Sequence, residues 1–310
     1  MKLELQQISK SFGDKKAVDR LSLETPRGRI CGVIGPNGAG KTTTIRMIMN
    51  ITVPDSGDIL IDGAPRPKDF LNRVGYLPEE RGLYKKMQVA EVMMYLAQLK
   101  GCSTSDVSGR IDGWLERMSL ADYKHKKVEE LSKGMQQKLQ FITTILHDPD
   151  LVILDELFSG LDPLNIELIK GIILELKRAG KTILFSTHVM EQAEKICDHI
   201  CMINRGRKVL DGSLADVKSR FGTNTIQVDM EGDGSFTADL PGVQKMTEFN
   251  NSLELRLEDG ADSNAILKAI ADRVHVRRFQ LVEPSLYDIF INVAQVDPED
   301  VELKRGEEQS

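Results

Sequence analysis

A glycine-rich run at residues 35–43 carries the clearest chemistry in the sequence. It reads Gly35-Pro36-Asn37-Gly38-Ala39-Gly40-Lys41-Thr42-Thr43. This matches the phosphate-binding pattern in which four residues separate a glycine from Gly-Lys-Ser/Thr. Glycines let backbone N–H groups wrap an anion without side-chain clashes, Lys41 can reach the outer phosphates, and the Thr42 hydroxyl can hold Mg²⁺. The run therefore predicts a nucleotide triphosphate site.

Two acidic residues follow an apolar stretch in the middle of the chain. Leu151–Leu154 is strand-like and leads directly into Asp155 and Glu156. A carboxylate at the tip of a neighbouring strand can hold the Mg²⁺ that Thr42 also contacts, and we assign this role to Asp155. Glu156 is predicted to be the general base that polarises the attacking water. The simpler interpretation, a strand followed by an acidic helix cap, is less favoured beside a phosphate loop.

A serine and a glycine open a helix-like run at Leu131–Lys138. Ser132 is predicted to be the N-cap of this helix. Together with Gly134 it would leave a helix N-terminus that offers N–H groups to an anion. The pattern alone does not distinguish a structural cap from an anion site. Its position shortly before Leu151–Glu156 favours the anion site.

The elements that must position these residues alternate between short β-runs and longer helical runs over residues 1–220. Arg29–Ile34 is β-prone and precedes the glycine run, and the helical pattern after it has Ile45, Ile48 and Met49 on one face. Further strands are expected at 74–77, 151–154, 182–185 and 200–203, and helices at about 89–100, 106–118, 133–147, 164–179 and 189–196. Short apolar runs bounded by breakers are typical of buried parallel strands. The sequence therefore predicts an α/β fold.

The pattern changes after about Phe221. Thr225–Met230 and Leu253–Leu257 alternate as strands do, and Phe249–Ser252 has the composition of a hairpin turn. A helix is expected at about 263–272, a strand near 274–282, and a last helix capped by Ser285 with Leu286, Ile289, Phe290 and Val293 on one face. We expect a small α+β domain at 221–295. Residues 296–310 are dense in charge and are predicted to be disordered.

Composition limits the classes of function. Hydrophobic residues make up 41% of the chain, charged residues 28%, and the net charge is −6, so no global basic field favours nucleic acid as a partner. The sequence has no apolar run of about 18 residues that would span a membrane, and its start does not read as a signal peptide. The four cysteines are typical of a protein in a reducing cytosol. Cys197, His199 and Cys201 could be metal ligands, but buried packing is the favoured interpretation.

Over about residues 2–220 the sequence resembles the nucleotide-binding subunit of ATP-binding cassette (ABC) transporters, because the expected motifs occur in the expected order. The resemblance implies a P-loop NTPase fold of the ABC ATPase type, with a mixed β core and a helical subdomain at about 85–145. By the same resemblance, Phe12 would stack on adenine and residues 35–43 would bind the phosphates of ATP. Leu131–Lys138 is similar to the family signature. The loop that communicates between subunits in this family resembles Ser159-Gly160-Leu161-Asp162. His188 resembles the switch histidine that senses the γ-phosphate.

The sequence departs from the family pattern in three places. Glu79 stands where the family usually has glutamine; either side chain offers an oxygen to Mg²⁺ or to the attacking water. Lys133 and Met135 replace residues that are often glycine and glutamine. Leu157 follows Glu156 where proline is common, so we expect Glu156 to be held less firmly. Glu79 and Lys133 resemble an exporter-type branch that also carries a C-terminal α+β extension.

The resemblance implies a head-to-tail pair in which ATP on one phosphate loop is capped by Ser132 and Gly134 of the other subunit. The pair would be a homodimer or include a paralogous cassette. Separately encoded integral-membrane permease subunits would contact residues 81–87 at the cytoplasmic face of the membrane. The C-terminal domain would support the dimer or regulate turnover. The alternative is a non-transport ABC ATPase acting on nucleic acid or the ribosome. A small-molecule kinase or a GTPase would not explain Ser132, Gly134 and His188 together.

Overall fold

The computed structural model describes residues 1–80, 82–221, 225–249, 252–258 and 260–294. Two compact units divide the chain, the first formed by Met1–Leu214 and the second by Ala215–Gln295. Arg81, the Asn250–Asn251 part of the expected hairpin turn, and the expected disordered tail at 296–310 lie outside the described residues. Within the described part of the chain, no helix combines the length and the apolar character needed to cross a membrane.

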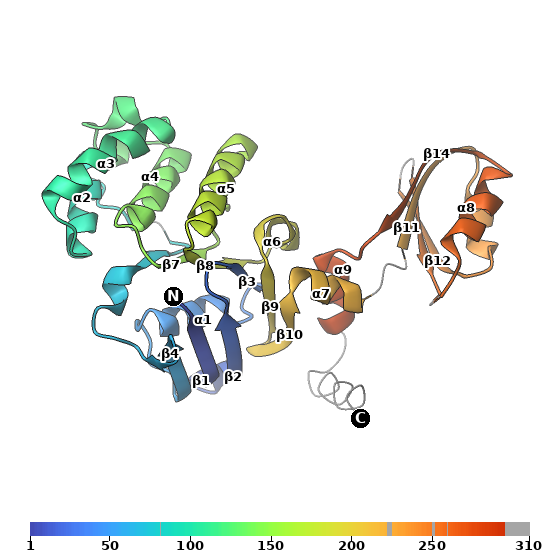
Figure 1. Ribbon diagram of the computed structural model, residues 1–310, viewed down its shortest axis with the longest axis horizontal. Coiled ribbons are helices and arrows are strands. Elements are labelled where there is room, and N and C mark those ends of the chain that lie inside the picture. The colour runs from blue at the N-terminus through green and yellow to red at the C-terminus, as the bar shows by residue number, and fades with distance from the viewer. Residues whose placement is uncertain (81, 222–224, 250–251, 259, 295–310) are drawn as a thin grey trace. The chain divides into compact units, whose positions relative to one another are not determined.

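A six-stranded sheet forms the centre of the first unit (Figure 1). Its order is β10-β9-β3-β8-β7-β6, and β9, β3, β8, β7 and β6 run parallel. The strands are β3 (Ile30–Ile34), β6 (Val74–Leu77), β7 (Leu151–Asp155), β8 (Thr182–Thr187), β9 (His199–Asn204) and β10 (Arg207–Ser213). Strands β3, β7 and β8 are buried along their whole length, which confirms the buried parallel strands that the apolar runs predicted.

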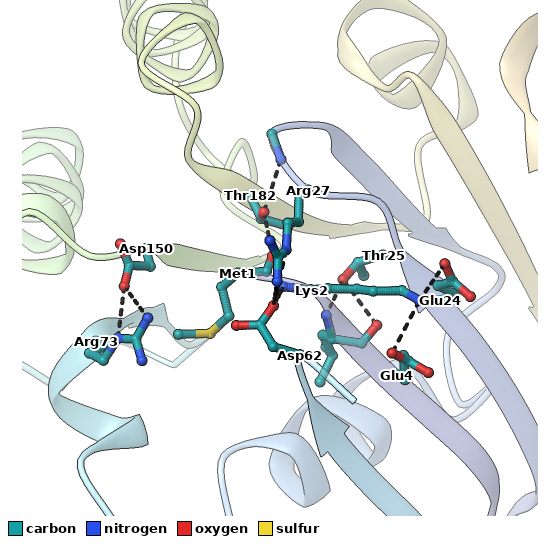
Figure 2. A network of polar contacts seen from close by, with 12 residues as sticks. Met1, Lys2, Glu4, Glu24, Thr25, Arg27, Asp62, Arg73, Asp150 and Thr182 are labelled. Atoms are coloured by element: carbon teal, nitrogen blue, oxygen red, sulfur yellow. Dashed lines mark hydrogen bonds and ion pairs between the residues drawn. The ribbon is translucent and has the colours of Figure 1, made fainter. Parts of the chain in front are cut away.

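A second, antiparallel sheet has the order β2-β1-β4-β5. Its strands are β1 (Leu3–Phe12), β2 (Lys15–Thr25), β4 (Ser56–Ile61) and β5 (Ala64–Pro65). Figure 2 shows the polar contacts that join the start of the chain to the parallel sheet. Thr182 Oγ1 at the start of β8 donates to the Met1 carbonyl at 2.7 Å, and the Lys2 N–H donates to Asp62 Oδ1 at 2.8 Å. The Thr182 bond joins the start of the chain to the parallel sheet, whereas the Lys2 bond joins the residue before β1 to the residue after β4 within the antiparallel sheet.

In the described part of the first unit, the α-helices that follow or connect the strands are α1 (Lys41–Ile48), α2 (Val89–Leu99), α3 (Thr104–Arg117), α4 (Lys133–Ile145), α5 (Pro163–Arg178) and α6 (Met190–Ile196). Helices α2, α3 and α4 gather into one group (Figure 1). Helix α4 also contacts β6. Helix α3 begins at Thr104, earlier than the predicted 106, because the Ser103 side chain accepts the Asp106 N–H at 3.2 Å and caps the helix. The short 3₁₀ segments are Phe70–Arg73, Ala121–Tyr123 and Val128–Glu130.

The core of the first unit lies between the two sheets and α1. Ile45 and Ile48 are fully buried, which confirms the predicted inner face of α1. Cys31, Cys197 and Cys201 are also buried, and burial raises the pKa of their thiols. His199 pairs instead with Asp211 at 2.8 Å. Among the described residues, no three His, Cys, Asp or Glu side chains are grouped to hold a metal ion. The burial of the three cysteines supports the packing interpretation.

The second unit is built on an antiparallel sheet of order β12-β13-β11-β14. Its elements are α7 (Leu214–Arg220), β11 (Thr225–Glu231), the 3₁₀ turn Ser235–Asp239, β12 (Val243–Phe249), β13 (Ser252–Leu257), α8 (Ser263–Ala271), β14 (His275–Val282) and α9 (Leu286–Ala294). Ile226, Val228 and Leu255 on one sheet face pack with Ile266 and Ile270 of α8. In α9, Leu286, Ile289 and Val293 are buried and the Asp288 N–H donates to Ser285 Oγ at 3.1 Å, as the predicted capped helix requires.

Candidate functional site

The phosphate loop leaves β3 at Ile34 and enters α1 at Lys41. Gly35 and Gly40 have φ of +154° and +108°, and a Cβ at these positions would lie 2.1 Å from the Ile203 carbonyl and 2.5 Å from the Ala17 carbonyl. The loop therefore requires glycine at both positions, because neighbouring backbone presses directly against it. Within the described residues no side chain caps the start of α1. Its first N–H groups are available to an anion.

Lys41 folds back over this loop. Its Nζ donates to the Gly35 carbonyl at 2.9 Å and to the Pro36 carbonyl at 3.2 Å. The same Nζ lies 3.6 Å from Glu156 Oε1, and only 6% of the residue is exposed. A buried ammonium group needs an anionic or carbonyl partner. The site thus holds a positive charge directly above the phosphate-binding backbone, next to the predicted general base.

Asp155 ends β7 and is fully buried. Its Oδ1 accepts a hydrogen bond from Ser186 Oγ at 2.8 Å, whereas Oδ2 has no hydrogen-bond partner within the described part of the chain. Burial raises the pKa of Asp155; the nearby hydroxyls of Ser186 and Thr42 oppose the rise, and the charges of Glu156 and Glu79 add to it. A buried carboxylate oxygen without a partner is suited to a hard cation such as Mg²⁺.

Glu156 directly follows β7 and has a left-handed backbone, with φ of +50°. A non-glycine residue in this region stores about 1–3 kcal/mol of strain and is found most often at functional sites. Its Oε1 lies 2.9 Å from His188 Nδ1, and its Oε2 lies 3.5 Å from Thr187 Oγ1. The structure thus brings Lys41, Asp155, Glu156 and His188 together, as the motifs predicted.

Four other predicted site residues lie outside this cluster. Ser132 is the N-cap of α4, as predicted, with its Oγ accepting the Met135 N–H at 3.3 Å. Asp162 is the N-cap of α5 and accepts the Asn165 N–H at 3.0 Å. Phe12, at the end of β1, is 55% exposed, with Lys10 Nζ 5.8 Å from its ring centroid. Gly134 lies in the first turn of α4. Among the described residues, none of the four forms a hydrogen bond with the phosphate loop.

Two side chains that the motifs do not predict, Ser186 and Thr187, support the acidic pair. Ser186 holds Asp155 from β8, and Thr187 lies between Glu156 and the Gln192 side chain, whose Oε1 is 3.3 Å from Thr187 Oγ1. The available signal was a polar Ser-Thr pair at the end of a strand that is otherwise apolar. Glu79, after β6, is exposed, and its charge acts on Asp155.

Family models match both parts of the chain. A model of the family described as "ABC transporter" matches residues 18–159, and one of an ATP-binding protein DrrA1-3-like C-terminal domain matches residues 212–294. The chain is 44% identical over 289 residues to the "Uncharacterized ABC transporter ATP-binding protein YhaQ" of Bacillus subtilis, covering 93% of this chain and 97% of that protein.

The chain belongs to the ABC transporter ATP-binding family. It is also 33% identical to the "Nod factor export ATP-binding protein I" of Paraburkholderia xenovorans, covering 96% of this chain and 98% of the relative. The solved "Structure of ATP binding subunit of ABC transporter" superimposes with a TM-score of 0.67 at 32% identity, over 71% of this chain and 93% of that one. As a member of this family the protein binds and hydrolyses ATP to power a transporter. The first unit has the P-loop NTPase fold of ABC ATPases.

Proposed function

We propose that the protein is the ATPase subunit of an exporter and works at the cytoplasmic face of a membrane with separate permease subunits. Relatives named for Nod factor export match the chain over both of its units, which supports export. The main observation in support of ATP hydrolysis is the cluster of Lys41, Glu156 and His188. This cluster lies beside a glycine-rich loop whose backbone N–H groups are available to an anion.

In this mechanism the phosphates of ATP accept hydrogen bonds from the N–H groups of the loop. Lys41 Nζ gives up a contact to a loop carbonyl or to Glu156 and binds a phosphate oxygen in its place. Thr42, Asp155 and Glu79 would hold Mg²⁺, which neutralises phosphate charge when bound. Glu156 accepts the proton of the attacking water, and His188 holds the Glu156 carboxylate in position and contacts the γ-phosphate. Phe12 stacks on the adenine.

Two such subunits enclose each ATP in a head-to-tail pair. Ser132 and Gly134 at the start of α4 supply the second set of N–H groups from the other subunit, and Asp162 lies in the loop between subunits. This assignment is supported by the separation of these residues from the Lys41 cluster within one chain. The second copy is either this same protein or a paralogous cassette.

The permease is proposed to contact residues 82–87 and the neighbouring face of α2 and α3. Tyr84 is 48% exposed and stacks edge-to-face on Tyr95, with ring centroids 5.4 Å apart. Next to it lies a hollow of about 420 Å³, with Met94, Tyr95 and Ile111 in its lining. An exposed aromatic and aliphatic surface is typical of a protein interface. Co-purification of a multi-span membrane protein in mild detergent, lost in Tyr84→Asp, would test the contact.

The role of Glu156 is tested by Glu156→Gln. This change keeps the shape of the side chain but removes the proton acceptor, so ATP hydrolysis should fall about 10²–10⁴-fold. ATP affinity, measured by titration with a fluorescent analogue, should stay close to wild type. Lys41→Ala is the matched variant that should instead lose ATP binding. Turnover of Glu156→Gln within a few-fold of wild type would exclude Glu156 as the base.

A further inference from the structure

Helix α4 carries a row of buried polar side chains, and the mechanism above does not use them. Gln137 is 6% exposed, Lys138 and Gln140 are 7% exposed, and Thr143 and Thr144 are also buried. Buried polar groups almost always form hydrogen bonds, so the partners of these side chains show which segments α4 is bonded to. Lys138 Nζ donates to the Met118 carbonyl at 2.7 Å and Thr143 Oγ1 to the Gln140 carbonyl at 2.8 Å, both within the helical group.

Gln137 makes a different connection. Its Nε2 donates to the Leu157 carbonyl and, at 3.2 Å, to the Ser159 carbonyl. Both carbonyls belong to the turn directly after Glu156, in which the Ser159 N–H also bonds back to the Glu156 carbonyl at 3.1 Å. The other end of the same amide, Oε1, is buried without a partner among the described residues. The amide is therefore placed for its two donated bonds, which fix the turn.

This turn needs an external restraint. Glu156 has a left-handed φ of +50°, which a non-glycine residue adopts only when its surroundings impose it. Leu157 is not the proline that would restrict the preceding residue. Leu157 and Phe158 are buried, and the Glu156 N–H is held by the Ser186 carbonyl at 3.0 Å. Gln137 fixes the carbonyl side of the same turn, so the backbone that carries Glu156 is held on both sides.

The position of Gln137 in α4 also connects the start of this helix to the turn that carries Glu156. Gln137 lies three residues after Gly134, so the two share one face of the helix within one turn. The start of α4 and the turn that carries Glu156 are thus joined through a single rigid turn of helix. A shift of the α4 N-terminus would move Gln137 and, with it, the carbonyls that fix Glu156.

We propose that Gln137 is a positioning residue for ATP hydrolysis, which links the N-terminus of α4 to the catalytic turn of the same subunit. The inference rests on the proposed roles of Glu156 as base and of the α4 N-terminus as a nucleotide contact. When the N-terminus of α4 contacts a nucleotide, Gln137 transmits the resulting shift of the helix to the turn that carries Glu156. Glu156 of the same subunit is then aligned for hydrolysis.

The test replaces Gln137 with Met, which keeps a similar volume and flexibility but removes both donors. Misplacing a catalytic group by about 1 Å costs about 10²-fold, so kcat should fall about 10- to 100-fold, with ATP affinity and KM within about twofold of wild type. Gln137→Glu, which puts oxygen where the donor stood, should lower kcat at least as much. Thr143→Val is the control, because it removes a buried hydroxyl of the same helix whose hydrogen bond goes to the Gln140 carbonyl of that helix.

A double-mutant cycle separates a positioning role from general loss of structure. In the Glu156→Gln background, Gln137→Met should lower the residual rate less than twofold, because its effect passes through Glu156. Equal losses in both backgrounds, or an unchanged kcat in Gln137→Met, would overturn the proposal while leaving the base assignment intact. A fully active Glu156→Gln enzyme would instead overturn the proposed function itself.

Discussion

At the scale of single residues, the buried carboxylate of Asp155 lowers the stability of the folded protein, although its proposed role in holding Mg²⁺ requires it to be charged. Burial disfavours its charged form, and Oδ2 has no partner within the described part of the chain. The pKa of the folded state is thus above the unfolded value of 3.8. The folded protein binds a proton more tightly, so the free energy of unfolding falls as pH rises from about 4 through the raised pKa of the folded state.

Asp155→Asn should therefore stabilise the protein while inactivating it. A neutral amide avoids the charge penalty, and its Oδ1 can still accept from Ser186. We expect the free energy of unfolding at pH 7, without nucleotide, to rise, and the melting temperature to rise with it. ATPase activity should fall at least about 100-fold. Calorimetry checks the first expectation, with exposed Asp14→Asn as the control that should change little; a lower melting temperature for Asp155→Asn would contradict it.

Residues of the site differ in how well the sequence predicts them. Lys41, Asp155 and Glu156 were predicted because each lies in a local run whose spacing already implies its chemistry. Ser186 and Gln137 were not, since their partners are 31 and 20 residues away along the chain. Only the folded sheet and helix bring them together. A serine at a strand end and a glutamine in a helix have many ordinary explanations, and no local pattern chooses among them.

At the scale of elements, the parallel strands were predictable and the antiparallel sheet was largely not. Strands buried on both faces appear as continuous apolar runs. In β1 and β2 the alternation is broken, because Gln7 and Arg20 have left-handed backbones and the register shifts between the two strands. Such bulges move later side chains to the opposite face and remove the period of two. Only the first residues of β1 kept a readable pattern.

The contact between β6 and α4 gives a prediction at this scale. A Cβ on Gly75 would lie 2.2 Å from the Thr144 carbonyl, so Gly75→Ala must push α4 away from the sheet. We expect a loss of about 1–3 kcal/mol in the free energy of unfolding. Gly113→Ala, in α3, meets no atom within 4 Å and should gain about 0.5–1 kcal/mol. The single tryptophan, Trp114, reports urea unfolding of the first unit. Equal midpoints for the two variants would contradict this packing.

At the scale of the whole molecule, neither the sequence pattern nor the structure of one chain specifies how two subunits assemble. The first unit gathers the phosphate loop and the acidic pair in one place, and leaves Ser132 and Gly134 at the start of α4 without a bond to that loop among the described residues. In the proposed pairing, a second cassette completes each of these half-sites. ATP would then be a shared ligand that stabilises the paired state by mass action.

The proposed pairing is tested by placing a charge at the start of α4. Nothing lies within 4 Å of a Cβ on Gly134, and aspartate in a first helical turn favours the helix, so Gly134→Asp should fold normally. Its carboxylate would face the phosphates of ATP bound by the other subunit. In the hydrolysis-blocked Glu156→Gln background, light scattering should show an ATP-dependent dimer that Gly134→Asp weakens at least about 100-fold. ATP binding by each monomer should persist, because Lys41 is untouched. Gly113→Asp, at another open helical glycine, should dimerise normally, and a Gly134→Asp variant that pairs equally well would exclude this arrangement.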